Sequence, residues 1–282
     1  ITGSSPQTVN YGASGTAVTA TPATGYHFVQ WSDGSTTNPR TDTNVQANIS
    51  VMATFAANPP AQLVISTVPH GTAGVALSPS VTVTVEDAGG VPVIGDTNSV
   101  TLSITSGPGG FDAASTVTAS FVNGVATFGN LILDTAGNYT LSAVDAGDSL
   151  SAGPSNTFTI SPAAAQLVFT IQPADVLQGK TQATVAVTEQ DQFGNVVTTD
   201  SASSVNFTVT ACGNPVSLGS ALMVSGVATL SNSSQRFYAL ASGLTVGAAS
   251  SGSFTGSAIS NTFNVTANGD ILFSDGFDGC RL

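Results

Sequence analysis

Charged side chains are scarce in this sequence of 282 residues. Only 7% of its residues are Asp, Glu, Lys or Arg, whereas about 25% is usual in soluble domains. The charges present are mainly acidic, 16 against 4 basic, and the net charge is −12. A chain with so few Lys and Arg side chains cannot neutralise many phosphates, so nucleic acid and anionic lipid are excluded as partners.

Long apolar runs and cysteine motifs are also missing. No run of 18 apolar residues occurs, so no membrane-spanning helix is expected. The two cysteines, Cys212 and Cys280, lie outside any Cys-x-x-Cys motif. They could form one disulfide in an oxidising compartment, within one chain or between two chains. The sequence begins at Ile1 without a basic, apolar leader, which predicts a mature secreted product or a fragment.

The parts of a catalytic site are lacking as well. The two histidines, His27 and His70, are expected to lie in different domains, and no Gly-x-Ser-x-Gly or His-Glu-x-x-His motif occurs. Residues 179–181 (GKT) look like the end of a phosphate-binding loop, but Ala174 stands where its first glycine is required. We therefore expect a protein that is not an enzyme and has no cofactor.

What the chain does contain is a long internal repeat. Residues 61–64 (AQLV) recur 104 residues later as 165–168, and 155–158 (SNTF) recur in the same order as 260–263. A period of this length corresponds to one β-sandwich domain rather than to a short solenoid unit.

Alternating apolar residues predict strands in both copies. The alternating sets are Val81/Val83/Val85, Val100/Leu102/Ile104, Tyr139/Leu141/Ala143, Val205/Phe207/Val209/Ala211 and Leu244/Val246/Ala248. In front of the repeat, residues 26–31 and the alternating residues 45–55 predict two more strands, and 32–35 (SDGS) predict a turn.

The predicted fold class is therefore all-β. A small β-rich module at 1–57 is followed by two tandem Ig-like β-sandwiches at 61–161 and 165–267 and by a strand-like tail at 268–282. Residues 58–60 (NPP) form a short, stiff linker between the first two units.

Residues 19–22 (TATP), 25–32 (GYHFVQWS) and 51–55 (VMATF) carry a resemblance to the divergent InlB B-repeat family of bacterial surface proteins. The resemblance covers about 45 residues. Members are small β-rich modules of secreted and surface proteins, so the resemblance implies a role without catalysis.

The two repeats resemble bacterial Ig-like domains of the invasin and intimin kind. The resemblance is carried by 191–197 (DQFGNVV) and 226–229 (GVAT) in the second copy and by 136–143 (AGNYTLSA) in the first. In the second copy, residues 239–248 take the place of this last segment and no longer match its pattern. The tail is similar to a short signature at the C-terminus of some secreted proteobacterial proteins.

The tail is apolar and strand-like. Ile271, Leu272, Phe273 and Phe277 are candidates for self-association, because an exposed strand pairs readily with a free sheet edge.

Two kinds of ligand site were considered. Carboxylates that could gather around Ca²⁺ are Glu86/Asp87, Glu189/Asp191 and Asp270/Asp275/Asp278, although none has the spacing of an EF-hand loop. Trp31 and Tyr26 could form a stacking surface for a sugar, or Trp31 could pack in the core of the small module.

These observations predict a non-enzymatic extracellular structural protein on a bacterial surface. It would be a subunit of a filament built by head-to-tail strand addition, or the stalk of an adhesin. A glycan- or receptor-binding module and the accessory C-terminal region of a secreted hydrolase are the alternatives. The expected partners are further copies of the chain, or a cell-surface or host glycan or protein.

Overall fold

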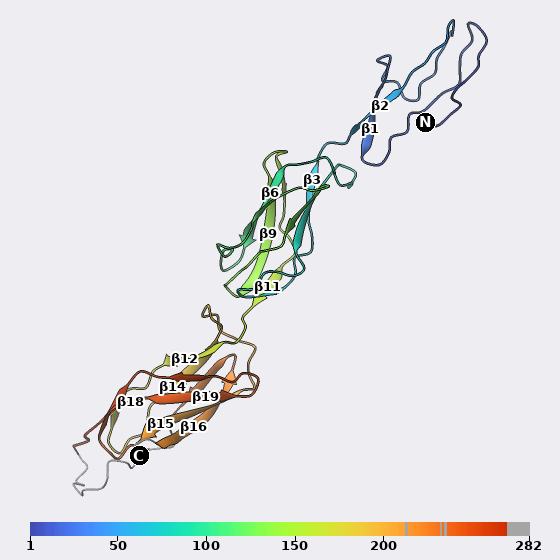
Figure 1. The fold of residues 1–282 in the computed structure, drawn as a ribbon. Helices are drawn as coiled ribbons and strands as arrows, with labels where there is room; N and C mark the ends of the chain where they lie inside the picture. The colour runs from blue at the N-terminus through green and yellow to red at the C-terminus, as the bar shows by residue number, and fades with distance from the viewer. Residues whose placement is uncertain (212–213, 232, 234–235, 270–282) are drawn as a thin grey trace.

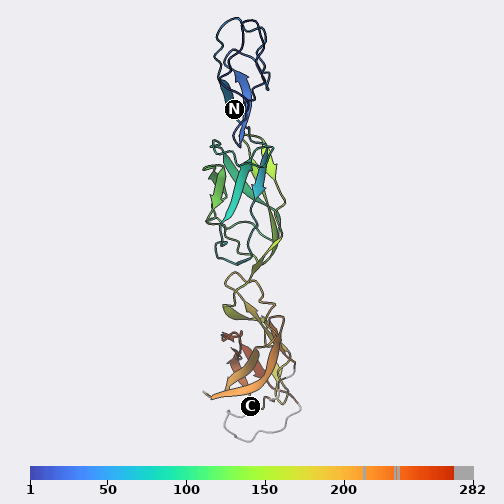
Figure 2. The same ribbon diagram turned by 90° about the vertical axis from the view of Figure 1, so that its right-hand side faces the viewer.

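The computed structural model describes residues 1–211, 214–231, 233 and 236–269. Within these residues the chain is all-β, and its strands fall into three groups that follow one another in a row (Figure 1). We call them the N-terminal module (β1 and β2), sandwich 1 (β3 to β11) and sandwich 2 (β12 to β21). The view turned by 90° shows the same elongated arrangement, with the module and sandwich 2 at opposite ends (Figure 2). The described part of the chain has no helix with the length and apolarity that a membrane crossing requires.

The N-terminal module contains one antiparallel pair, β1 (Tyr26–Trp31) with β2 (Ala53–Ala57). The predicted strand at 26–31 and the turn after it are confirmed, because Gly34 N donates to the Trp31 carbonyl and adopts a positive φ. The prediction of a strand over 45–55 is wrong for its first part, since the strand begins only at Ala53. Alternation shows that a segment has an apolar side, but a strand also needs a continuous ladder with a partner. Residues 45–52 make backbone hydrogen bonds only at their ends, from Val45 to residues 12–13 and from Met52 to Ser32.

Sandwich 1 packs two antiparallel sheets around one apolar core. Its strands are β3 (Gln62–Ile65), β4 (Gly71–Thr72), β5 (Val81–Glu86), β6 (Ser99–Ser106), β7 (Thr118–Ser120), β8 (Val125–Phe128), β9 (Gly137–Asp145), β10 (Leu150–Ala152) and β11 (Phe158–Ser161). One sheet has the order β3-β5-β8 and the other β4-β11-β9-β6-β7, with β10 also paired to β9 and with β4 parallel to β11. The predicted alternation on β5, β6 and β9 is confirmed, because those apolar side chains face the shared core.

Tyr139 fixes one corner of sandwich 1. Its ring is buried near the start of β9 and stacks on Phe158, and its hydroxyl donates to the Thr135 carbonyl at 2.7 Å. A tyrosine that bonds back to the chain a few residues upstream is a recurrent feature of Ig-like sandwiches.

Sandwich 2 repeats this plan with its own core. Its strands are β12 (Gln166–Ile171), β13 (Val176–Leu177), β14 (Val185–Gln190), β15 (Ser204–Ala211), β16 (Asn214–Val224), β17 (Val227–Leu230), β18 (Ala241–Leu244), β19 (Val246–Ser251), β20 (Ser257–Ile259) and β21 (Phe263–Thr266). The long β16 pairs with both β15 and β17, so one sheet runs β12-β14-β17-β16-β15-β19-β20, and β13-β21-β18 forms the other. Val205, Phe207, Val209, Val246 and Ala248 are buried as their alternation predicted.

The repeated Gly-Val-Ala-Thr segments are the exits of tight turns. Asn123-Gly124 and Ser225-Gly226 each have two consecutive positive φ angles, 52° and 78° in the first copy and 49° and 76° in the second. This is the geometry of a two-residue hairpin loop whose twist matches that of the flanking strands. Glycine at the second position adopts it without a steric penalty, which explains why the motif recurs.

Candidate functional site

The junction between sandwich 1 and sandwich 2 is made by the loop that follows β14. Asp191 organises this loop, because its Oδ1 accepts the backbone N–H groups of Phe193 and Asn195, both at 2.9 Å. Its Oδ2 accepts Asn195 Nδ2 at 2.8 Å. Such a turn, held by an aspartate at its first position, gives the loop one defined shape.

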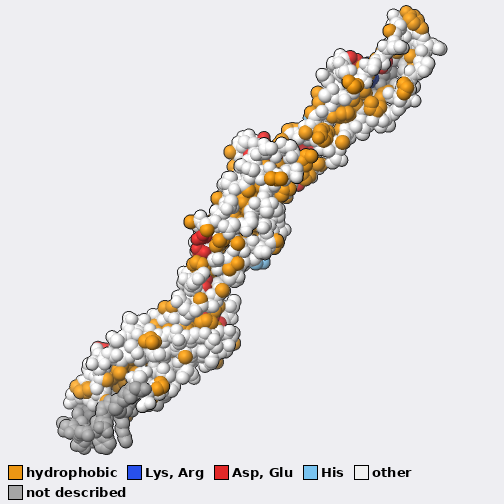
Figure 3. Space-filling view, viewed as in Figure 1, with side chains coloured by type: hydrophobic (Ala, Val, Ile, Leu, Met, Phe, Trp, Pro, Cys, Tyr) orange, Lys and Arg blue, Asp and Glu red, His pale blue; other side chains and the backbone are white. Residues whose placement is uncertain are grey.

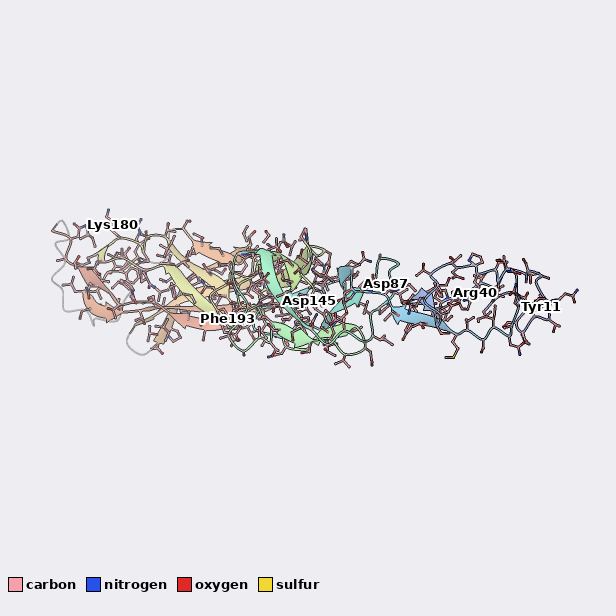
Figure 4. All side chains as sticks on the ribbon, turned by 90° about the horizontal axis from the view of Figure 1, so that it is seen from above. Tyr11, Arg40, Asp87, Asp145, Lys180 and Phe193 are labelled. Atoms are coloured by element: carbon pink, nitrogen blue, oxygen red, sulfur yellow. The ribbon has the colours of Figure 1, made fainter. Side chains whose placement is uncertain are left out.

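The loop then contacts sandwich 1. Asn195 Nδ2 donates to the Asp134 carbonyl at 2.6 Å, and Asn195 Oδ1 accepts the Ala136 N–H at 3.1 Å. The Phe193 ring lies so close to Gly74 that a Cβ on this glycine would overlap it. Figure 4 shows Phe193 on the side of sandwich 2 that faces sandwich 1. Two hydrogen bonds and one ring contact therefore hold the two sandwiches together at this point.

The junction between the module and sandwich 1 uses the equivalent loop after β5. Asp87 Oδ1 accepts the N–H groups of Gly89 and Val91 at 2.8 and 2.9 Å. Its Oδ2 accepts Asn58 Nδ2 at 2.6 Å, and this bond is the main reason why the pKa of Asp87 is lowered. Asn58 also reaches the module, because its N–H donates to the Gly25 carbonyl and its Oδ1 lies 3.1 Å from His27 Nδ1. One asparagine thus bridges the two units.

The predicted calcium groups at these loops have another role in the structure. Both oxygens of Asp87 and both of Asp191 are bonded to N–H donors of the protein, which suits a structural turn. Glu86 accepts Gln62 Nε2 at 2.9 Å. Ca²⁺ is bound by carboxylate oxygens that are free to coordinate it, and those of Asp87 and Asp191 are occupied by N–H donors.

Glu189 lies buried beside Asp200 in sandwich 2. Burial, together with the neighbouring Asp200 carboxyl, raises the pKa of Glu189 to about 7. Hydrogen bonds from Ser203 and Ala202 hold the pKa of Asp200 well below its usual range, despite its own burial. Glu189 is thus protonated at acidic pH and begins to lose its proton near neutral pH, whereas Asp200 carries the charge over the same range.

The N-terminal module encloses a cavity of about 550 Å³. Its walls include the extended segments 4–9 and 45–51, and Trp31 and Arg40 also line it. The Arg40 guanidinium lies 5.5 Å from the Trp31 ring centre and bonds to Asp42 and Asp33 at 2.7 and 2.9 Å. These bonds raise the pKa of Arg40 further above its usual value, so it carries its charge at every relevant pH. In the space-filling view, apolar surface is widespread over this module (Figure 3).

The structure separates the two predicted ligand-binding aromatics. Trp31 is only 1% exposed and packs against Phe28, so its ring belongs to the interior of the module, the alternative considered from the sequence. Tyr26 is 45% exposed and lines a different cavity, of about 310 Å³, at the junction with sandwich 1. The two rings do not form one stacking surface, and ligand binding by Tyr26 stays a prediction.

Several predicted sites lie outside the described residues. They are the disulfide partners Cys212 and Cys280, the self-association residues Ile271, Leu272, Phe273 and Phe277, and the acidic group Asp270/Asp275/Asp278. All of these remain predictions.

The sequence did not point to a further acidic group in sandwich 1. Asp96, Asp145 and Asp148 each bring a carboxylate oxygen within 4.8 Å of the other two. Asp96 lies some fifty residues from the other pair in sequence, and no short motif contains all of them. Only the pairing of β6 with β9, in which Val100 is opposite Asp145, brings them together.

Comparison with known proteins found one family match and several solved structures of similar fold. Residues 1–59 match the model of the divergent InlB B-repeat domain. Among solved structures, the D0–D1 domain of intimin is 16% identical with a TM-score of 0.27, covering 73% of this chain and 98% of that one. The FN1–FN3 domains of chicken CNTN1 are 8% identical with a TM-score of 0.40, covering 74% and 67%. No curated protein matches the chain.

The BSP domain of a biofilm associated protein is 18% identical with a TM-score of 0.22, covering 73% of this chain but only 30% of that one. These likenesses concern the fold alone. The chain is a modular all-β protein in which a B-repeat domain is followed by Ig-like sandwiches. Its N-terminal module is an InlB B-repeat domain, as residues 19–55 predicted.

Proposed function

We propose that this chain is a non-enzymatic stalk on a bacterial surface, which holds a terminal module away from the cell. The observation that carries the proposal is that both domain junctions are held by side chains. Asn58 bonds to the module and to Asp87, and Asn195 bonds to its own loop and to Asp134. Domains joined by a linker alone move relative to one another, whereas bonds across each boundary favour a stiff rod.

The surface supports the same proposal. Sandwich 1 has no Lys or Arg, since none occurs between Arg40 and Lys180. Pairs of hydroxyl groups join the neighbouring strands β6 and β7, such as Ser99–Ser120 and Thr101–Thr118, both at 2.9 Å. A surface rich in hydroxyl groups and without basic side chains suits a spacer. The match of the module to a B-repeat domain supports a location at the cell surface.

The stalk proposal is tested by measuring bending at the junctions. Small-angle X-ray scattering and negative-stain electron microscopy of the full chain should show straight rods with a narrow range of angles. The double variant Asn58→Ala/Asn195→Ala should widen this range, while the control Asn130→Ala, whose side chain bonds to Ala114 within sandwich 1, should not. Freely bending wild-type rods would contradict the proposal.

A more specific proposal is that copies of the chain assemble into a filament. It is supported by the apolar, strand-like sequence of residues 270–282 and by the edge strands β7 and β20, each of which has a neighbour on one side only among the described strands. The full chain should form fibres, and a chain that ends at residue 269 should stay as single rods. Equal assembly of both would exclude the tail as the connecting strand and leave the stalk unaffected.

A binding role for the module is favoured by its cavity. The cavity of about 550 Å³ has the size of a small-ligand site, and the extended segments along it have backbone groups outside any ladder. A glycan or an extended peptide from another protein would fit such walls. Trp31 is the single tryptophan, so its fluorescence should shift when a panel of glycans or peptides is titrated onto the chain. No shift with any of them would remove this candidate.

A further inference from the structure

Three aspartates of sandwich 1, Asp96, Asp145 and Asp148, lie together, and the protein supplies hydrogen bonds to only some of their carboxylate oxygens. Asp96 precedes β6, Asp145 ends β9, and Asp148 lies in the turn that leads to β10. One oxygen of each is already bonded. Asp96 Oδ1 accepts Asn98 N at 2.8 Å, Asp145 Oδ1 accepts Gly147 N at 2.8 Å, and Asp148 Oδ2 accepts Asn98 Nδ2 at 2.9 Å. These bonds fix the orientation of all three carboxylates.

The remaining oxygens of the two inner residues have no partner. Asp145 is 0% exposed and Asp96 is 9% exposed, and the Oδ2 atoms of both are buried without a hydrogen bond. A buried, unpaired carboxylate oxygen costs free energy, and a second carboxylate beside it adds repulsion. No Lys or Arg side chain exists in this sandwich to offset the charge. A cation from solution would offset this charge and fill the open oxygen positions.

Sandwich 2 shows a different arrangement at the equivalent position. Asp200 is the counterpart of Asp96, since each donates its N–H to the carbonyl three residues before it, at 3.2 Å. Val205 is paired with Ser250 as Val100 is paired with Asp145, so Ser250 and Ser253 stand in place of the two other aspartates.

Hydroxyl groups satisfy the aspartate there. Asp200 Oδ2 accepts Ser253 Oγ at 3.2 Å, and Asp200 Oδ1 accepts two backbone N–H groups. In sandwich 2 the aspartate thus has donors on both oxygens and one carboxyl neighbour, Glu189, whereas in sandwich 1 it has two carboxyl neighbours and one oxygen without a partner.

We propose that Asp96, Asp145 and Asp148 form a calcium site. Hard oxygen ligands without any nitrogen or sulfur favour Ca²⁺ or Mg²⁺ over Zn²⁺. Asp148 is exposed, so water reaches the site from its side and completes the six to eight ligands that Ca²⁺ takes. Ca²⁺ also tolerates irregular geometry, whereas Mg²⁺ demands a near-ideal octahedron and keeps most of its waters.

The bound ion would also act on the first junction. Asp96 ends the loop that starts at Asp87, and residues of this loop, Val91 to Gly95, line the cavity beside Tyr26 and Asn58. A cation that ties Asp96 to β9 fixes the far end of the loop that contacts the module. Calcium would therefore stiffen the rod as well as stabilise sandwich 1.

The test is calcium binding by the full chain, measured by calorimetry after treatment with EDTA. We expect one ion per chain with a Kd in the range of extracellular modules, roughly 10⁻⁴ to 10⁻³ M. Asp148→Asn removes an exposed ligand charge without disturbing the core, and it should weaken binding by at least about tenfold. Glu86→Gln is the matched control, because it removes one charge from the same sandwich outside the group. Loss of binding in the control but not in Asp148→Asn would overturn the assignment.

A second variant separates a metal site from a purely structural role. Asp145→Asn keeps the oxygen that accepts Gly147 N but removes the buried charge. In EDTA this variant should melt at a higher temperature than the wild type, because the repulsion is gone. In millimolar Ca²⁺ the order should reverse, because only the wild type gains stability from the ion. Absence of binding, or the same order of melting temperatures in both conditions, would overturn the proposal.

Discussion

Asn195 donates from Nδ2 to the main-chain carbonyl of Asp134 at 2.6 Å, across the boundary between the two sandwiches. The same amide nitrogen bonds to Asp191 within its own loop. A single side chain therefore shapes the loop and attaches it to the neighbouring domain. The loop after β5 achieves the same end differently, with Asn58 of the linker bonding to Asp87 of the loop.

Phe193 should control the stiffness of the second junction. In Phe193→Ala the ring that rests on Gly74 is lost, while the hydrogen bonds of Asn195 remain. We expect the angle between the sandwiches to vary more widely in small-angle scattering, with the melting temperature of each sandwich unchanged. The control is Tyr238→Ala, which removes an exposed aromatic ring of sandwich 2 away from the junction loop. An effect as large in the control would show that the ring contact is not specific.

Glu189 should make the stability of sandwich 2 depend on pH. Its pKa in the folded protein is raised from 4.5 to about 7, so the folded state binds its proton more tightly than the unfolded state. Stability from this group is complete below about pH 4.5 and is lost as the pH rises through 7. Asp200, whose pKa is lowered, acts in the opposite direction and only at pH values below about 4.

The variant Glu189→Gln should remove this dependence. Above pH 7 it should be more stable than the wild type, by roughly 3 kcal/mol at most, since each pKa unit corresponds to about 1.4 kcal/mol. Near pH 4.5 the two should be equal. Calorimetric melting of both proteins across this range is the measurement, and a wild-type stability that rises from pH 5 to 8 would contradict it.

Two glycines with similar backbone angles should differ in their tolerance of alanine. Gly226 and Gly194 have φ of +76° and +86°, so alanine at either position meets the cost of a left-handed conformation, about 1 kcal/mol. A Cβ on Gly226 would also lie 2.5 Å from the Val197 carbonyl oxygen, whereas a Cβ on Gly194 meets nothing within 4 Å. We therefore expect Gly226→Ala to lose at least about 2 kcal/mol and Gly194→Ala about 1 kcal/mol in denaturant unfolding.

Trp31 should behave as a buried fluorophore. Because the ring is 1% exposed, its emission should lie at short wavelength and acrylamide should quench it only weakly. Both properties should change to those of exposed tryptophan in denaturant, and this transition reports on the module alone because the chain has no other tryptophan. Emission typical of a solvated ring in the native protein would contradict the packing of the module.

Features of the fold that depend on neighbouring residues could be predicted from the sequence, whereas features that depend on residues far apart in the chain could not. Strands β5, β9 and β15 follow from alternating apolar residues, because a strand buried on one face shows a period of two. The hairpin turns at Asn123-Gly124 and Ser225-Gly226 were not predicted, although glycine at the second position is compatible with the positive φ found there. The strand predicted at 45–52 failed because alternation carries no information about a partner.

The roles of the acidic residues were not predictable in the same way. Asp87 and Asp191 were considered from the sequence as residues that could bind Ca²⁺, and in the structure their oxygens accept N–H groups that only the folded loop supplies. Asp96 was not noticed, since its neighbours in space are some fifty residues away in the chain.

The sequence by itself determined an all-β chain, two copies of one Ig-like unit and a B-repeat domain before them, because periodicity, turn residues and motifs are properties of neighbouring residues. Only the tertiary structure decided which carboxylates accept hydrogen bonds on both oxygens and which lie next to other carboxylates with an oxygen left unbonded. Asp96 lies beside Asp145 and Asp148 in one copy, whereas Asp200 at the equivalent position accepts the Ser253 hydroxyl in the other. That difference is made by residues brought together through strand pairing.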